Sequence, residues 1–185
     1  MAVGVLLLVY VGSQYYQMHR EQKRLEAAWE KQQNTAPEAS AEPTKSTDDG
    51  LIRLTIPKID LSAIVVNGTT RMDLKSGPGK ITGTPLPGEV GNSVISAHRD
   101  TFFRHIYELK PGDEIDVQRN GQSLKFEVTG KKIVEPDDLS VLKQTEERQL
   151  TLLTCYPIYY IGPAPHRLVV FSKLVGKNDV AQTRP

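Results

Sequence analysis

Short stretches of alternating apolar and polar residues recur along the chain from Leu51 to Lys173. A period of two is typical of strands that bury one face, and branched residues favour the same structure. Glycine, proline and asparagine separate the stretches. The pattern predicts seven or eight strands among the segments 51–56, 58–66, 91–98, 113–118, 123–128, 131–136, 149–155 and 167–174. Short strands at such close spacing favour a closed barrel or a sandwich, an all-β fold.

Turn and helix signals lie between these strands. The pair Asn120-Gly121 predicts a two-residue hairpin. Short helices are predicted over residues 70–76, over residues 100–109 with Asp100 as the N-cap, and over residues 136–143 with Pro136 at the head.

The beginning of the chain has a different pattern. An apolar run from Ala2 to Gly12 precedes Tyr15 and Tyr16 and then several basic residues. The run is about half of the roughly 20 residues that a bilayer-spanning helix needs. It lacks the basic start and the small-residue cleavage site of a signal peptide. We interpret it as the outer part of an uncleaved membrane anchor whose upstream end is missing; a buried apolar helix is the alternative.

The following residues predict the domain organisation. Residues 17–33 are rich in good helix formers and should continue the same helix as a stalk. The segment 34–50 has no large apolar side chain and predicts a flexible linker. We therefore expect an anchor segment with its stalk over residues 1–33, a linker over 34–50, a folded catalytic domain over 51–176 and a C-terminal tail over 177–185.

Composition narrows the function. Lys and Arg number 23 against 22 Asp and Glu, a net charge of +1, which argues against a nucleic-acid-binding protein. The single cysteine, Cys155, excludes a disulfide within the chain and a cluster of cysteines around a metal. Asp137 and Asp138 are too few carboxylates to predict a calcium site, so we expect neither a metal nor a cofactor.

Three residues at predicted strand ends suggest chemistry. Cys155 ends one apolar strand, His98 ends another, and Arg167 begins the last. A thiol attacks a carbonyl as the thiolate, which a neighbouring imidazole helps to form. A guanidinium can stabilise the oxyanion that results, and the imidazole can protonate the leaving amine. We predict a nucleophile, an acid/base and an oxyanion stabiliser, although each residue alone could be structural. The other histidines are His19, His105 and His166.

The segments SAHRDTFFR, TLLTCYP and APHRLVV, in this order, resemble the three active-site segments of the sortase family. The resemblance extends over residues 51–173 and implies a closed eight-stranded β-barrel with short helices. It also implies cleavage of an LPxTG-like sorting signal after Thr, a thioester on Cys155 and transfer of the surface protein to an amine of a peptidoglycan precursor. An anchor in the membrane of a Gram-positive cell, with the domain outside, belongs to the same resemblance. HRDTFFR, CYP and the compact loop before Arg167 resemble class D.

By the same resemblance, residues 135–149 would form the wall that receives the Leu and Pro of the signal. The candidate substrate-binding residues are Leu139, Val141, Leu142 and Thr154. On the residues alone, the first three are equally compatible with the buried face of a short helix.

Two alternatives are other enzymes that use Cys and His, and a protein that is not an enzyme. L,D-transpeptidases and papain-like hydrolases also use Cys and His, but the glycine motif of the first is absent. In papain-like hydrolases the catalytic Cys precedes the His along the chain, whereas His98 precedes Cys155 here. The alternative outside these enzymes is a membrane-anchored β-barrel that acts as a binding or scaffold module and has a non-catalytic Cys.

Overall fold

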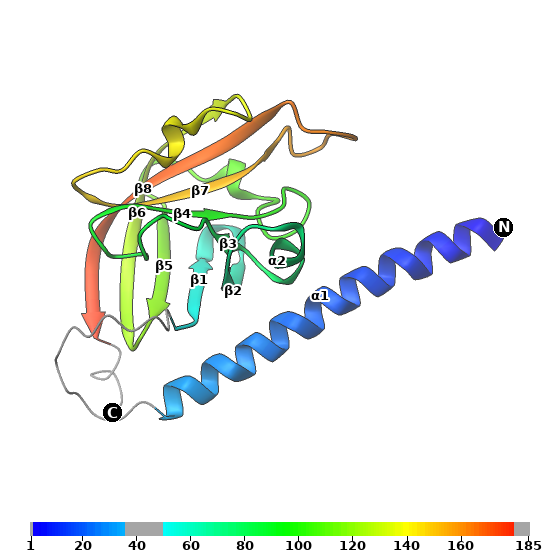
Figure 1. Cartoon of the computed structure of the whole chain (residues 1–185), viewed down its shortest axis with the longest axis horizontal. Coiled ribbons are helices and arrows are strands. Elements are labelled where there is room, and N and C mark those ends of the chain that lie inside the picture. Colours follow the sequence, from blue (N-terminus) through cyan, green and yellow to red (C-terminus); the bar gives the residue numbers. More distant parts are fainter. Residues whose placement is uncertain (1, 36–49, 180–185) are drawn as a thin grey trace.

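Eight strands close into a barrel in the computed structural model, which describes residues 2–35 and 50–179. The strands are β1 (Ile52–Ile56), β2 (Leu61–Asn67), β3 (Gly79–Lys80), β4 (Gly91–Ser96), β5 (Glu114–Arg119), β6 (Gln122–Val134), β7 (Arg148–Tyr156) and β8 (His166–Asp179). Around the barrel their order is β1-β2-β3-β4-β7-β8-β6-β5 (Figure 1). The predicted closed barrel is confirmed, and the sandwich is not formed.

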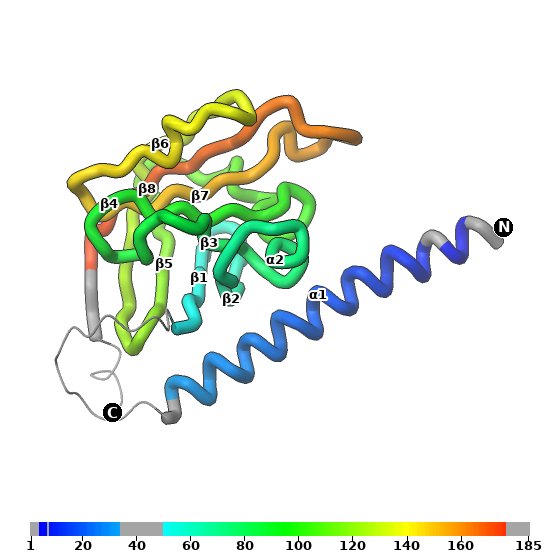
Figure 2. The backbone as a smooth tube through the Cα atoms, viewed as in Figure 1, coloured from blue at the N-terminus to red at the C-terminus, as the bar shows by residue number. Residues whose placement is uncertain are grey.

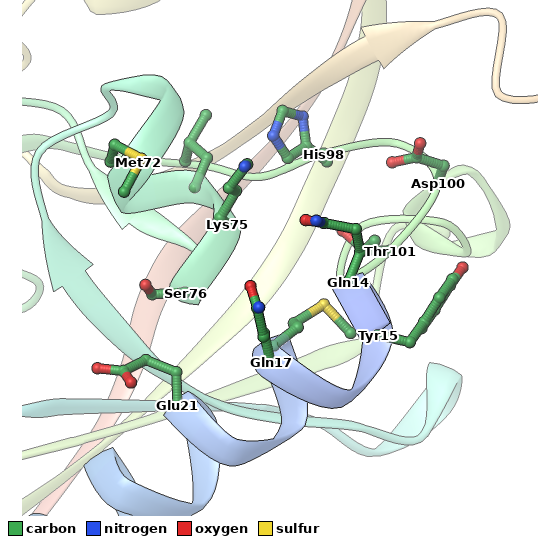
Figure 3. A pocket seen from close by; sticks show the side chains of 12 residues that line it. Gln14, Tyr15, Gln17, Glu21, Met72, Lys75, Ser76, His98, Asp100 and Thr101 are labelled. Atoms are coloured by element: carbon green, nitrogen blue, oxygen red, sulfur yellow. The ribbon is translucent and has the colours of Figure 1, made fainter. Parts of the chain in front are cut away.

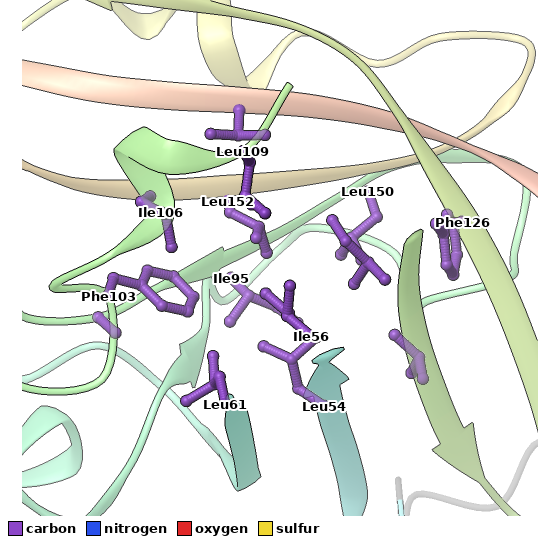
Figure 4. Packing of buried hydrophobic residues seen from close by; sticks show 14 of the residues in the cluster. Leu54, Ile56, Leu61, Ile95, Phe103, Ile106, Leu109, Phe126, Leu150 and Leu152 are labelled. Carbon is purple, nitrogen blue, oxygen red and sulfur yellow. The ribbon is translucent and has the colours of Figure 1, made fainter. Parts of the chain in front are cut away.

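The alternating apolar residues meet inside the barrel (Figure 4). In β1, for example, Ile52, Leu54 and Ile56 are buried whereas the residues between them are partly exposed. Burial of one such side chain stabilises the fold by about 1.5–3 kcal/mol. The core is filled from every side of the barrel, so the strand ends at its rim are held by a rigid interior.

The β5–β6 hairpin turns at Asn120 and Gly121, as predicted. Both residues have positive φ angles, 46° and 71°, which Asn and Gly adopt more readily than other residues. β6 is longer than expected, because it joins the two predicted strands 123–128 and 131–136 into one with a register shift between Val128 and Gly130. β3, only two residues long, was not predicted.

The short helices differ from expectation in two places. α2 (Arg71–Ser76) is formed as predicted, with a capping box at its start. Residues 100–109 do not form the predicted α-helix but turns and a single 3₁₀ turn, η2 (Ile106–Glu108). Phe103, Ile106 and Leu109 are all fully buried, and a spacing of three fits three residues per turn. Residues 136–143 likewise form only a 3₁₀ turn, η3 (Leu139–Leu142), and Pro136 is not at its head. A further such turn, η1 (Pro57–Ile59), connects β1 to β2.

The N-terminal helix α1 (Ala2–Thr35) is continuous. It passes the side of the barrel formed by β1, β2 and α2, and its first turns extend beyond the barrel (Figure 1). Its exposed apolar residues are Val5, Leu6, Leu8, Val9, Tyr10, Val11, Tyr15 and Tyr16. In the described ranges 2–35 and 50–179, no helix has an apolar stretch long enough to cross a membrane.

The second half of α1 contacts the barrel, which the interpretation as a stalk did not include. The side-chain amide of Gln22 accepts a hydrogen bond from the Ile64 N–H at 3.0 Å and donates one to the Ile64 carbonyl at 3.3 Å. It also donates to the carbonyl of Ser76. Trp29 is buried, and the guanidinium of Arg53 lies 5.7 Å from its ring centroid. Gln22 therefore pairs with the backbone of β2 as a neighbouring strand would.

Residues 36–49 of the predicted linker and 180–185 of the predicted tail lie outside the described residues. β8 runs to Asp179, three residues beyond the predicted end of the domain.

Candidate active site

Three neighbouring strands carry the candidate catalytic residues. β7 lies between β4, with which it is parallel, and β8, with which it is antiparallel. Ala97, Leu152 and Leu168 belong to the barrel core. Because side chains alternate between the two faces of a strand, His98, Cys155 and Arg167 lie on the opposite, outward face. The structure thus brings the three predicted residues to one rim of the barrel and one face of the sheet.

Cys155 and Arg167 are directly opposite each other in the β7–β8 ladder. Residues opposite each other in an antiparallel pair have Cα atoms about 4.5–5.5 Å apart and point to the same side. Both side chains are partly exposed. A guanidinium and a thiol in this position can meet at one bound group.

Backbone contacts fix His98 on both sides. Before it, the Ala97 N–H donates to the Leu153 carbonyl at 3.2 Å, which extends the β4–β7 ladder by one residue. After it, the His98 carbonyl accepts a hydrogen bond from the N–H of Phe103 at 3.1 Å, and Phe103 is anchored in the core. Within the described part of the chain, neither ring nitrogen of His98 has a hydrogen-bond partner among the bonds found. The imidazole is therefore free to exchange protons with a ligand.

A cavity of about 560 Å³ lies beside His98 (Figure 3). Its walls come from α1, from α2 and from the residues after β4; they include Gln14 and Gln17, Lys75, and Asp100 with Thr101. The N-terminal helix thus reaches the histidine side of the site. Cys155 and Arg167 do not line this cavity.

The other histidines are engaged elsewhere. Nδ1 of His105 lies 2.8 Å from the carboxylate of Glu108, and this contact lowers the pKa of Glu108. Nδ1 of His166 lies 3.3 Å from the carboxylate of Glu135. His166 pairs with Tyr156 in the ladder, one position beyond the Cys155–Arg167 pair, so it is on the other face of β8. His19 belongs to α1 and is exposed.

The guanidinium of Arg167 is held at one nitrogen. Nη1 donates to the carbonyl of Ala164 at 3.2 Å and to that of His166 at 2.9 Å. No hydrogen bond of Nε or Nη2 to another described residue is found. These remaining donors have the fixed, forked geometry that suits an oxygen anion.

Buried Asn92 connects the strands of the site to the segment predicted to bind substrate. Its amide donates to the carbonyl of Val141 at 2.9 Å and accepts a hydrogen bond from the hydroxyl of Thr151 at 2.7 Å. At the start of η3, Ser140 donates its backbone N–H to Asp138, and hydrogen bonds to Ser140 lower the pKa of that carboxyl. This role of Asn92 was not predicted, because a polar residue at the start of an apolar strand is usually exposed.

The structure separates the predicted substrate-binding residues. Val141 is 7 % exposed and packs with Val134 and Val169 in a second apolar cluster on the outer side of the sheet. Leu142 is partly buried against that cluster, whereas Leu139 is 72 % exposed. Val141 is therefore buried in this cluster, which agrees with the alternative interpretation that it belongs to the buried face of a short helix.

Thr154, the fourth candidate substrate-binding residue, lies inside the barrel wall. Its side chain is 1 % exposed, and its hydroxyl donates a hydrogen bond to the Ala97 carbonyl at 2.7 Å. A buried hydroxyl that is already bonded is closed to a peptide on the outer face. Thr154 connects β7 to the end of β4, and a direct contact with substrate stays a prediction.

No group of three or more His, Cys, Asp and Glu side chains that could hold a metal ion occurs in residues 2–35 and 50–179. The chemistry that the rim supports is that of a thiol, an imidazole and a guanidinium on adjacent strands. These groups can together carry out acyl transfer through a thioester.

Comparison with known proteins agrees with this geometry. The family model described as the sortase domain matches residues 54–175. Sortase D of Bacillus subtilis (strain 168) is 38% identical over 138 residues, which are 74% of this chain and 69% of the relative. Sortase A of Bacillus anthracis is 30% identical over 128 residues, 67% of this chain but only 59% of that relative.

Solved structures of sortases have the same fold. A Sortase D5 transpeptidase of Clostridium perfringens superposes with a TM-score of 0.67 at 26% identity and covers 85% of this chain and 98% of its own. The catalytic domain of the SrtD of B. anthracis gives a TM-score of 0.61 at 32% identity and covers 78% of this chain and 99% of its own. The chain belongs to the sortase family of cysteine transpeptidases, class D.

Proposed function

We propose that this sortase cleaves an LPxTG-like sorting signal after its Thr, holds the surface protein as a thioester on Cys155 and transfers it to an amine of a peptidoglycan precursor. The observation that carries the proposal is the pairing of Cys155 with Arg167 on the outward face, with His98 at the end of the adjacent strand. Membership in a family of transpeptidases removes the support for a scaffold with an inert Cys.

In the first half of the reaction, the Cys155 thiolate attacks the carbonyl carbon of the Thr residue. A C–S bond forms, and the carbonyl oxygen becomes an oxyanion to which Arg167 donates hydrogen bonds. When the C–N bond breaks, His98 gives a proton to the leaving amine. The products are a thioester on Cys155 and a free peptide that begins with Gly.

In the second half, an acceptor amine replaces the leaving group. His98 takes a proton from the amine, which attacks the thioester carbonyl, and a second oxyanion forms against Arg167. Collapse of this intermediate forms the new amide and releases the thiolate of Cys155. Atoms and charges balance without a cofactor, because one amine replaces another.

The contacts around Asn92 support a place for the sorting signal. They fix η3 and its neighbours over the outward face of β4 and β7, on which Cys155 also lies. Exposed Leu139 on this segment offers an apolar contact for the signal. The acceptor would approach from the His98 side.

The proposal also places the enzyme in the cell. Sortases are usually membrane-associated, and we propose that the N-terminal segment anchors this one with its catalytic domain outside. The first turns of α1 extend beyond the barrel and carry the exposed apolar residues Val5, Leu6, Leu8, Val9, Tyr10 and Val11, which support an anchoring role for this part of the helix. Tyr15 and Tyr16 follow them at the position expected of residues at a membrane surface.

Incubation of the purified full-length chain with a library of LPxTG-like peptides and candidate amines tests the proposal. Mass spectrometry should find the N-terminal peptide fragment attached to Cys155 and, after amine is added, a new amide product. A wild-type protein that forms no thioester with any member of the library would refute it. Omission of the amine is the control, and it should leave the thioester or its slow hydrolysis product.

A further inference from the structure

Arg99 follows His98 directly, and both Nη atoms of its guanidinium donate hydrogen bonds within the protein. Nη1 donates to the carbonyl of Pro157 at 3.0 Å, and Nη2 donates to the carbonyls of Tyr160 and Gly162, both at 2.9 Å. The same guanidinium lies 5.8 Å from the ring centroid of Tyr160. Hydrogen bonds from a charged donor are roughly twice as strong as neutral ones. One side chain thus holds three carbonyls of a single loop.

The loop held by Arg99 connects β7 to β8 and extends beyond the barrel (Figure 2). Its tip has little packing of its own, because Tyr159, Tyr160 and Ile161 are exposed. A segment with few buried contacts opens easily unless other bonds restrain it. Further contacts of this loop come from the residues after His98. Arg104 lies 5.6 Å from the Tyr159 ring centroid, and a hydrogen bond with Tyr159 raises the pKa of Tyr107.

The same loop holds Arg167 at its far end. The carbonyls of Ala164 and His166 accept the hydrogen bonds that fix Nη1 of Arg167. Arg99 therefore holds the first part of the same loop whose last part holds the guanidinium opposite Cys155. Its own Nη atoms are occupied by the loop carbonyls, so it does not touch the reacting atoms.

We propose that Arg99 is a positioning residue for transpeptidation: it fixes the β7–β8 loop and thereby the direction in which Arg167 presents its free donors. This inference rests on the proposed function. A guanidinium that is misplaced by about 1 Å can reduce turnover about a hundredfold. Loss of Arg99 acts through Arg167, so the two residues are energetically coupled.

Kinetics of the full-length chain with an LPxTG-like peptide test this coupling. Arg99→Ala should lower kcat by about ten- to a hundredfold with a smaller change in KM. Arg99→Lys should not restore it, because one ammonium cannot bond three carbonyls in a fixed fork. Arg104→Ala is the matched control: it removes the same charge from a residue that stacks on the same loop, and it should stay close to wild type. The rate of Cys155 alkylation by iodoacetamide should be unchanged in all three variants.

A double-mutant cycle gives the decisive result. In an Arg167→Ala background, Arg99→Ala should cost little further activity. If it costs as much as in wild type, or if Arg99→Ala alone keeps wild-type kcat, the positioning role is wrong. A fall in alkylation that matches the fall in kcat would also contradict it, because the fault would then lie in the fold or in the nucleophile.

Limited digestion with chymotrypsin separates this inference from the proposed function. Cleavage after Tyr159 or Tyr160 under native conditions reports on the order of the loop and needs no substrate. It should be faster in Arg99→Ala than in Arg104→Ala. If the wild type forms no thioester, the proposed function fails by itself; equal cleavage of the two variants would overturn the role of Arg99.

Discussion

Thr154 donates its hydroxyl proton to the backbone carbonyl of Ala97 at 2.7 Å. The two residues directly precede Cys155 and His98, so one buried hydrogen bond joins the strand ends that carry the proposed nucleophile and acid/base. Replacement of Thr154 by Val keeps the shape of the side chain but leaves the Ala97 carbonyl without its partner. An unpaired buried acceptor costs about 1–3 kcal/mol.

We expect Thr154→Val to lower the free energy of unfolding by about that amount and to lower kcat as well, because the end of β4 is released. Thr154→Ser keeps the hydroxyl and should recover much of the activity. Chemical denaturation and steady-state kinetics on the same samples are the measurements. Equal activity of the Val and Ser variants would show that the hydrogen bond does not position His98.

Cys155→Ala should abolish formation of the thioester with any LPxTG-like peptide and leave the fold intact, because the change is small and on a partly exposed side chain. Mass spectrometry detects the acyl-enzyme, and circular dichroism checks the fold. Peptide cleavage by the variant at a rate comparable to that of wild type would contradict the proposed nucleophile.

His98→Ala should lower turnover at least about a hundredfold, the usual minimum for loss of general acid–base catalysis. His105→Ala and His166→Ala are matched controls in the same fold. They should cost far less, since each of these rings is paired with an exposed carboxylate. A larger loss for His166→Ala than for His98→Ala, measured as kcat, would reverse the assignment.

Arg167→Lys keeps the charge opposite Cys155 but replaces a planar fork with a single ammonium. If Arg167 stabilises the oxyanion, we expect turnover to fall roughly 30- to 1000-fold, equivalent to about 2–4 kcal/mol of transition-state stabilisation. The iodoacetamide rate at Cys155 should persist, because the nucleophile and His98 are untouched. Near-normal turnover would leave the oxyanion to backbone N–H groups.

Gln22→Ala should lower the free energy of unfolding by about 1–3 kcal/mol, because it removes the partner of the Ile64 N–H and carbonyl on β2. Lys23→Ala changes the next, exposed position of the same helix and should be nearly neutral. Thermal or chemical denaturation of the full-length chain compares the two. Equal stability of both variants would mean that α1 adds nothing to the fold through Gln22.

Much of the barrel could be predicted because one face of each strand is buried and the alternation is visible in the sequence. β3 left no such signal, since Gly79 and Lys80 are too few residues for a period of two. The prediction of an α-helix after His98 was wrong. Phe103, Ile106 and Leu109 are apolar residues that suit an α-helix or a 3₁₀ turn equally well, and only their burial shows that the buried positions recur every three residues.

The rim of the barrel was only partly visible in the sequence. The sequence indicated that Cys155, His98 and Arg167 lie at strand ends. It did not indicate that their strands are neighbours, because the order of the strands depends on how the sheet closes. Arg99 and Asn92 were missed because their partners are mostly backbone carbonyls, which leave no mark in a sequence. The contact of α1 with β2 was also missed, because it is made by the single side-chain amide of Gln22 and not by an apolar stripe along the helix.

The short β3 leaves much of the adjoining side of β2 without a strand partner, and Gln22 covers part of it. A row of open backbone groups on such an edge is a template for a strand from another molecule. We therefore expect the N-terminal helix also to protect the chain against self-association. A chain shortened past Gln22 should oligomerise as its concentration rises, whereas the full-length chain has this site on β2 already occupied.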